Sequence, residues 1–445
     1  MASAAEQLAA NLNLSAFAKA TELKQRIWFT LGALIVYRLG TYIPLPGINP
    51  DAYADAFSNV QAGILGMFNM FSGGAVERMA IFALNIMPYI SASIIMQLMT
   101  AVSPHLEQLK KEGEQGRKQI NQYTRYGTVF LAALQAFGIA VGLENAQNIV
   151  TDPGLFFRIS TVITLTSGTI FLMWLGEQIT ARGVGNGISL IIFAGIVAEL
   201  PRALGQTLEL GRTGGFPVFG IVALFVLAVV VIYVIVFMER SQRRLLVQYP
   251  KRQMGNKMVG GEKSHLPLKL NSAGVIPPIF ASSLLLLPAT LVGFSGNNPD
   301  LPGWVTSLTA ALGPGQPAYM ALYAGGIIFF CFFYTAIVFN PEDTADNLKK
   351  YGGFIPGIRP GKRTAEYIDY VLTRLTVVGA LYLPAVCLLP EYLRGAYNIP
   401  FYFGGTSLLI VVSVTMDTVA QVQSYLLAHQ YEGLIKKARL RGARR

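Results

Sequence analysis

Long apolar runs recur from one end of the chain to the other, separated by shorter polar segments. A helix needs about 20 mostly apolar residues to cross roughly 30 Å of hydrocarbon, because each residue rises about 1.5 Å. The run 188–208 is the weakest, because Glu199, Pro201 and Arg202 interrupt its end. The pattern predicts an all-α polytopic membrane protein with ten transmembrane helices, near 25–44, 76–101, 122–142, 155–175, 188–208, 216–238, 272–292, 318–340, 370–390 and 402–424.

Composition supports one integral membrane domain. Of the 445 residues, 53% are hydrophobic and 13% are charged, whereas soluble domains carry about 25% charged residues. Such a chain would expose too much apolar surface in water. Ten spans divide into five plus five, which predicts an N-terminal half at 1–214 and a C-terminal half at 215–445, related as an inverted repeat around a central pathway.

The formal net charge of +11 fits either nucleic-acid binding or a topology signal. Its placement favours topology, because Lys and Arg occupy alternate loops while 293–317 has none. The basic segments are therefore expected in the cytoplasm, with both termini. The N-terminus lacks a small-residue cleavage site, so the first run is expected to be a retained span. The basic segments are 102–121, 239–271, 341–369 and the tail 425–445.

No chemical motif stands out from this background. Cys331 and Cys387 lie inside apolar runs, without disulfide or metal spacing. We predict no catalytic, cofactor-binding or metal-binding residue and no cofactor. Arg38 and Asp417 are isolated intramembrane charges, which fit an ion path or simple snorkelling and helix–helix bonding. An ion-coupled secondary transporter, the alternative function, is expected to carry more facing charges than these.

Two further features fall within or beside the spans. Residues 62–74 are apolar, too short to span and bounded by glycine, so we expect them to be buried in protein. Gln97, Thr124 and Asn271 lie toward the cytoplasmic ends of their spans. Uncharged polar side chains often bond neighbouring helices, each bond contributing about 0.6–2 kcal/mol, so these residues fit either ordinary interhelical bonding or a seam that can open.

Nine strings, in order along the chain, resemble the SecY family over essentially the whole sequence. Such a series is far more specific than any single motif. The strings are Met67–Gly74, Ile81–Ser93, Gln122–Gly127, Trp174–Thr180, Gly185–Ser189, Asn340–Pro341, Asn347–Lys350, Ile355–Gly361 and Pro400–Thr406.

The resemblance implies a protein-conducting channel in the bacterial cytoplasmic membrane. Two five-helix halves would translocate secretory polypeptides and release membrane segments sideways into lipid. The segment 62–74 would be the plug, including Met67, Phe68, Asn69, Met70, Phe71, Ser72, Gly73 and Gly74. The pore ring, an aliphatic collar, would consist of Ile86, Ile90, Ile188, Ile192, Ile279 and Ile410. Asn85 places a polar side chain directly before the ring residue Ile86.

The resemblance also implies a lateral gate and docking surfaces. Gln97, Thr124 and Asn271 match the polar seam of the gate, which a signal sequence would open. The expected partners are SecE-like and SecG-like membrane subunits, the motor ATPase SecA, the ribosome, signal sequences, unfolded preproteins and membrane lipid. Motor and ribosome docking would use the positions matching Arg243, Arg244, Lys251, Arg252, Arg359 and Tyr431.

Overall fold

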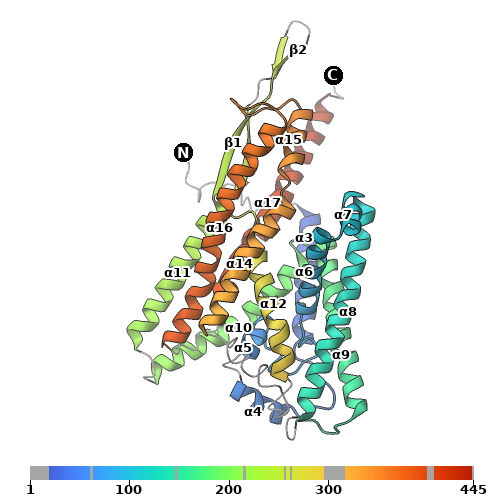
Figure 1. The fold of residues 1–445 in the computed structure, drawn as a ribbon, viewed down its shortest axis with the longest axis vertical. Helices are drawn as coiled ribbons and strands as arrows, with labels where there is room; N and C mark the ends of the chain where they lie inside the picture. Colours follow the sequence, from blue (N-terminus) through green and yellow to red (C-terminus); the bar gives the residue numbers. More distant parts are fainter. Residues whose placement is uncertain are drawn as a thin grey trace. The chain divides into compact units, whose positions relative to one another are not determined.

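The computed structural model describes residues 20–60, 64–145, 149–213, 217–254, 257–260, 263–294, 316–397 and 405–442. These residues are mostly helical (Figure 1). The helices are α3 Thr21–Gly40, α4 Pro50–Val60, α5 Ile64–Phe71, α6 Met87–Val102, α7 Pro104–Lys111, α8 Glu114–Asn145, α9 Leu155–Arg182, α10 Gly187–Arg212, α11 Val218–Arg240, α12 Ile276–Phe294, α14 Pro317–Val338, α15 Pro341–Lys350, α16 Lys362–Tyr397 and α17 Gly405–Gly442.

Each of the ten predicted spans overlaps one of these helices. Within the described ranges, seven helices are long and apolar enough to cross a membrane: α8, α9, α10, α11, α14, α16 and α17. Helices α6 and α12 provide shorter apolar stretches. Helix α10 continues through Pro201 to Arg212, so the interruption expected near 199–202 does not end it. The all-α polytopic fold is confirmed.

The start of the second span differs from the prediction. Residues 75–86 form turns, and α6 begins only at Met87, with Pro88 in its first turn. Met79 and Asn85 adopt φ values of 43° and 49°, in the left-handed region that interrupts a right-handed helix. Most apolar residues of this segment are buried inside the protein. Hydropathy alone does not distinguish such a buried segment from one that spans the membrane.

The basic segment 239–271 contains antiparallel strands that the hydropathy pattern does not predict. Strand β1, Gln242–Gln248, pairs with β4, Lys263–Lys269, and β2, Lys251–Met254, pairs with β3, Lys257–Gly260. In β1, Leu245 and Val247 are buried while the first three side chains are exposed. A search for 20-residue apolar runs cannot detect such short, half-buried strands.

The chain forms two compact units. The first comprises the described residues of Met1–Arg202, Leu286–Thr309 and Val414–Arg445. In it α8 packs against both α6 and α9, and α3 packs against α9. A small apolar cluster, Ala20, Leu23, Val184 and Leu426, joins the start of α3 to α17.

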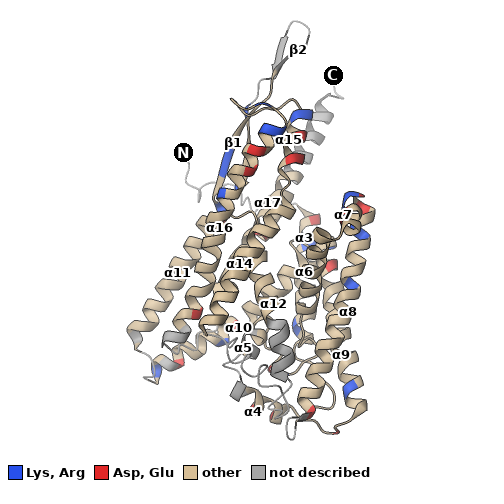
Figure 2. Cartoon of the chain, in the orientation of Figure 1, with Lys and Arg blue, Asp and Glu red and all other residues tan. Residues whose placement is uncertain are grey.

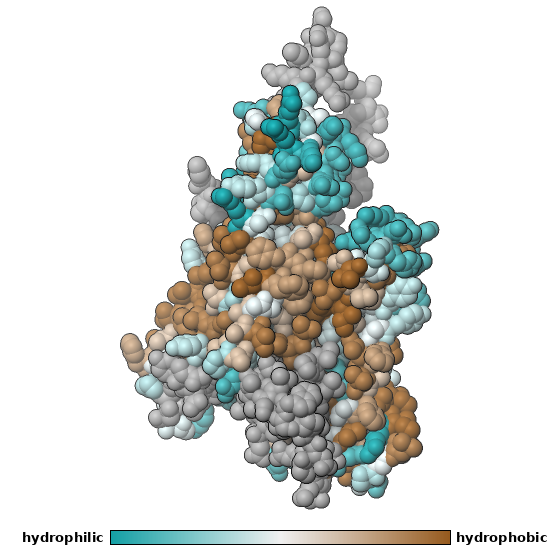
Figure 3. Space-filling view, in the orientation of Figure 1, coloured by the Kyte–Doolittle hydropathy of each residue, from teal (hydrophilic) through white to brown (hydrophobic). Residues whose placement is uncertain are grey.

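The second unit comprises the described residues of Ala203–Leu285 and Ala310–Ser413. Helix α16 packs against α14 and α15, and charged residues gather at the end that carries β1 and α15 (Figure 2). The apolar surface spreads over its helices (Figure 3). On α11, Phe219, Phe225 and Tyr233 are 84%, 67% and 71% exposed, as suits a helix facing lipid.

Candidate functional site

Helix α5 and the turn after it are buried in the first unit, as the sequence predicts for a short apolar segment. Phe68, Met70 and Phe71 are each at most 7% exposed, and so are the polar residues Asn69 and Ser72. Residues 62 and 63 lie outside the described residues, as does the side chain of Met67. Two glycines with φ values of 66° and 79° turn the chain back after α5, at Gly73 and Gly74.

The backbone at the end of α5 is bonded by side chains from outside the segment. The Asn85 amide Nδ2 donates to the Phe71 carbonyl at 2.6 Å. The Tyr37 hydroxyl of α3 donates to the Ser72 carbonyl at 3.2 Å. Carbonyls at a helix C-terminus lack intrahelical donors, so side-chain donors stabilise them.

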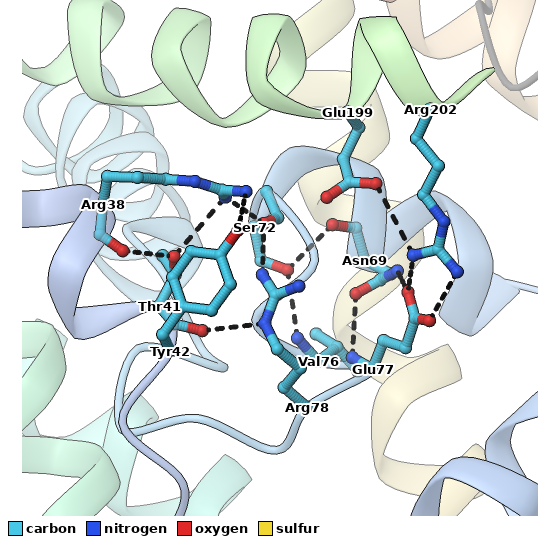
Figure 4. A network of polar contacts seen from close by, with 11 residues as sticks. Arg38, Thr41, Tyr42, Asn69, Ser72, Val76, Glu77, Arg78, Glu199 and Arg202 are labelled. Carbon is cyan, nitrogen blue, oxygen red and sulfur yellow. Dashed lines mark hydrogen bonds and ion pairs between the residues drawn. The ribbon is translucent and has the colours of Figure 1, made fainter. Parts of the chain in front are cut away.

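The next carbonyl, that of Gly73, accepts from two arginines (Figure 4). Arg38 Nη1 lies at 2.5 Å from it and Arg78 Nη2 at 2.9 Å. Both guanidinium groups also lie over the ring of Tyr42, at 4.8 and 4.2 Å from its centroid. Arg38 is thus held by the backbone that follows α5, rather than snorkelling away from it. We call Tyr37, Arg38, Arg78 and Asn85 the carbonyl cradle.

A second set of polar contacts ties α5 to α10 (Figure 4). Asn69 accepts at Oδ1 from the backbone N–H of Glu77 at 2.8 Å, and its Nδ2 donates to the Glu77 carboxylate at 3.3 Å. That carboxylate also accepts two bonds from Arg202 of α10, which lies 4.0 Å from Glu199 as well. Burial raises the pKa of Glu77, but Arg202, Asn69 and Arg78 together lower it below its ordinary value.

A glycine of α10 permits this close approach. A Cβ added at Gly195 would lie 2.5 Å from the Phe71 carbonyl oxygen and 3.0 Å from the Tyr37 hydroxyl. Real Cβ contacts essentially never reach the first distance, so any side chain at this position displaces α5 or its surroundings. The end of α5 is therefore seated directly on the backbone of α10.

The isoleucines of the predicted pore ring are divided between the two units. Ile86 and Ile90 lie one turn apart at the start of α6, and Ile188 and Ile192 lie one turn apart on α10. Residues four apart share a helix face, so each pair presents one aliphatic patch. The other two members, in the second unit, are Ile279 of α12 and Ile410 of α17.

The residues matched to the lateral gate make different contacts. Gln97 of α6 donates to Ser93 at 3.2 Å, and Thr124 of α8 donates to the Ile120 carbonyl at 3.0 Å, so each of these bonds lies within one helix rather than between helices. Helices α6 and α8 pack together in the first unit. Asn271 belongs to the second unit, where it donates to Glu239 at 2.7 Å.

Most residues that match the docking positions lie on the β1–β4 hairpin and the loop after α15, in the second unit. Arg243 and Arg244 are exposed on β1, and Arg359 is exposed on the loop after α15. A buried cluster joins the hairpin, this loop and α16 through Leu245, Leu268, Ile355, Ile368 and Val371. The side chains of Lys251, Arg252 and Tyr431 lie outside the described residues.

Sequence reasoning missed most of the residues that hold α5 in place. Tyr37, Glu77 and Gly195 were not singled out, and Glu199 and Arg202 were noted only as interruptions of a span. A detectable signal was the charged pair of residues 77 and 78 inside an otherwise apolar segment. Buried charges need partners, so such a pair indicates a polar network nearby.

The chain matches a family of known proteins along most of its length. A family model described as SecY matches residues 80–419. Protein translocase subunit SecY from Vibrio cholerae serotype O1 is 59% identical over 426 residues, which cover 95% of this chain and 96% of that protein.

Two solved structures share the fold. One is of a SecY protein whose plug domain stabilizes the closed state of the translocation channel and maintains a membrane seal. It aligns with a TM-score of 0.63 and 20% identity, over 92% of this chain and 93% of its own. The other is Sec61 in the canine ribosome-channel complex from the endoplasmic reticulum, with a TM-score of 0.65 and 17% identity over the same shares.

Proposed function

This chain belongs to the SecY family and is a protein-conducting channel of the bacterial inner membrane, and from this premise we propose how its parts carry a polypeptide across. The observation that carries the proposal is 59% identity to a protein translocase subunit along 95% of the chain. The ion-coupled transporter considered as an alternative has no support in these relatives. The proposed cargo is a secretory polypeptide, and membrane segments leave sideways into lipid.

The plug is proposed to be 62–74, with α5 as its helix. The burial of Phe68, Met70 and Phe71 and the close seat on Gly195 support this assignment. The related channel with a plug that seals its closed state supports it as well. A plug that moves must leave its carbonyl bonds to the cradle, so the strength of those bonds sets how readily the channel opens.

The six isoleucines are proposed to form the constriction. Small ions are reluctant to shed water in a narrow apolar collar, while an extended polypeptide slides past without strong binding. The division into halves at 1–214 and 215–445 remains part of the same proposal. The gate would lie between these halves, with Gln97 and Thr124 on one side and Asn271 on the other.

The basic cytoplasmic end is proposed to dock the motor and the ribosome. Arg243, Arg244 and Arg359 are exposed on one substructure, and Arg is suited to bidentate contact with carboxylate and phosphate. Sec61, a channel with the same fold, is part of a ribosome–channel complex. If the basic end lies in the cytoplasm, both termini lie there too. Small SecE-like and SecG-like subunits are the expected membrane partners.

Reconstitution tests the proposal directly. The chain with its SecE-like partner is placed in liposomes with SecA, ATP and a preprotein, and protease-protected preprotein is measured. Protection that requires both SecA and ATP is the expected result. A folded complex that binds SecA but protects no preprotein would contradict the proposal.

A further inference from the structure

Asn85 holds the plug from the side of the pore ring. Its side chain is buried, with 2% of the residue exposed, and its amide lies 2.6 Å from the Phe71 carbonyl. The neighbouring carbonyls of the plug helix behave differently. Those of Phe68, Asn69 and Met70 accept from backbone N–H groups of the turn that follows. The carbonyl of Phe71, by contrast, accepts from a side chain fourteen residues further along the chain.

The backbone at this position does not by itself require asparagine. The φ of 49° lies in the left-handed region, which glycine adopts most readily and which asparagine and aspartate tolerate. The carboxamide also leaves its Oδ1 without a hydrogen-bond partner among the described residues. An unpaired buried acceptor is unfavourable. The contact that favours asparagine here is therefore the bond from Nδ2 to the plug.

Asn85 is also adjacent in the chain to a residue of the proposed pore ring. It directly precedes Ile86, the N-cap residue of α6, and Ile90 follows one turn later. A polypeptide entering the ring must push these side chains aside. Because Asn85 and Ile86 share a peptide bond, a displacement that moves the Ile86 backbone also changes the distance from the donor to the Phe71 carbonyl.

We propose that Asn85 is a positioning residue that retains the plug in its seat and couples plug release to displacement of the ring residue Ile86. The proposal rests on the function proposed above, since it presumes that α5 is the plug. It adds a specific contact through which an arriving polypeptide loosens the seal.

The test compares three variants in purified channel complexes reconstituted into liposomes, without preprotein or motor. Asn85→Gly removes the amide and keeps a residue suited to φ 49°. Asn85→Asp keeps the shape but replaces the donor with a carboxylate facing the Phe71 carbonyl. Gln135→Leu is the matched control, because it removes another buried carboxamide, on α8, which packs against α6, α7 and α9. The readout is halide permeability, with thermal melting to check folding.

Loss of one net hydrogen bond shifts an equilibrium about two- to tenfold. We expect Asn85→Gly to raise halide permeability by this amount, Asn85→Asp to raise it at least as much, and Gln135→Leu to match the wild type. Wild-type permeability in a folded Asn85→Gly or Asn85→Asp channel would overturn the proposal, and so would an equal rise in Gln135→Leu. Failure of the proposed function is distinguishable, since it appears as absent SecA-dependent protection in the wild type.

Discussion

Both terminal nitrogens of Arg202 reach the carboxylate of Glu77, at 2.6 Å from Nη1 to Oε2 and 2.8 Å from Nη2 to Oε1. The side chains are 47% and 21% exposed, respectively. A bidentate pair of this kind is stronger than an ordinary surface pair. Because Glu77 also bonds Asn69 of α5, the segment proposed as the plug, Glu77 links α10 to α5.

Neutralising this pair is expected to loosen the plug. Glu77→Gln or Arg202→Gln should weaken its retention by about 1 kcal/mol, or roughly a fivefold shift in the plug equilibrium. Export of a preprotein with a weakened signal sequence should rise accordingly, because less work is needed to open the channel. Quantitative export in cells that carry each variant measures the effect.

The pair of Arg125 and Glu177 provides the matched control. It is also bidentate, at 3.1 and 2.7 Å, but joins α8 to α9 without contacting the plug. Glu177→Gln is therefore expected to leave export of the weakened preprotein unchanged. Exchanging the two charges, as Glu77→Arg with Arg202→Glu, should restore part of the wild-type behaviour. Equal export in Glu77→Gln and Glu177→Gln would contradict the assignment.

The same carboxylate predicts a pH dependence. The pKa of Glu77 is lowered in the folded protein, so the unfolded chain binds a proton more readily than the folded one. Its contribution to stability is complete above its ordinary pKa of 4.5 and is lost as the pH falls through the lower folded value.

Melting temperatures of wild type and Glu77→Gln, measured from pH 7 down to pH 3, check this prediction. Their difference should be constant near neutrality and shrink as the pH falls below 4.5, where the unfolded chain binds a proton more readily than the folded one. A difference that persists unchanged to pH 3 would show that the carboxylate's charge is not what stabilises the contact.

Gly195 predicts a steric effect on the plug. Alanine normally stabilises a helix by about 1 kcal/mol relative to glycine. At Gly195 the added Cβ would lie 2.5 Å from the Phe71 carbonyl oxygen, so overpacking should destabilise the protein by about 1–3 kcal/mol and displace the plug. Gly205→Ala, on the same helix with nothing within 4 Å, is the control and should be neutral or stabilising. Thermal melting and halide permeability separate the two variants.

Much of the fold follows from hydropathy, because a bilayer imposes both the length and the composition of a spanning helix. The start of α6 could not be predicted in this way. Residues 75–84 are apolar apart from the charged pair at 77 and 78, yet Met79 and Asn85 turn the backbone, and tertiary burial replaces lipid contact. The strands of 239–271 were missed because their buried positions, such as Leu245 and Val247, are too few to register as a run.

The burial of α5 was predictable from its apolar pattern, because an apolar segment too short to span must be covered by protein. Its cradle was not, because Tyr37 and Arg38 of α3 meet Arg78 and Asn85 of the turns at 75–86 only through folding. Hydrogen bonds to backbone carbonyls leave no pattern in a single sequence, since any donor side chain can supply them.

Asn271 predicts an effect on the lateral gate. It donates to Glu239 at 2.7 Å and to the Gly274 carbonyl at 3.0 Å. Asn271→Leu removes both bonds and should shift the balance of closed and open channels, seen as altered export of preproteins with weakened signal sequences. Ser272→Ala, at the exposed neighbouring position, is the control. Export of these preproteins at the wild-type level in Asn271→Leu would count against a gate role.

Arg359 predicts a defect in motor-driven export without a defect in folding. Its side chain is exposed, while the loop beneath it is fixed by buried Ile355 and by the bond from Thr364 to the Arg359 carbonyl at 2.8 Å. Because Thr364 contacts only the backbone at this position, Arg359→Glu should preserve the loop and the melting temperature. Reversing the charge should weaken SecA docking and reduce SecA-dependent protection of preprotein at least tenfold.

Arg212→Glu, which reverses an exposed charge near the end of α10, should retain full protection. Full protection in Arg359→Glu would place the motor contact elsewhere on the cytoplasmic surface.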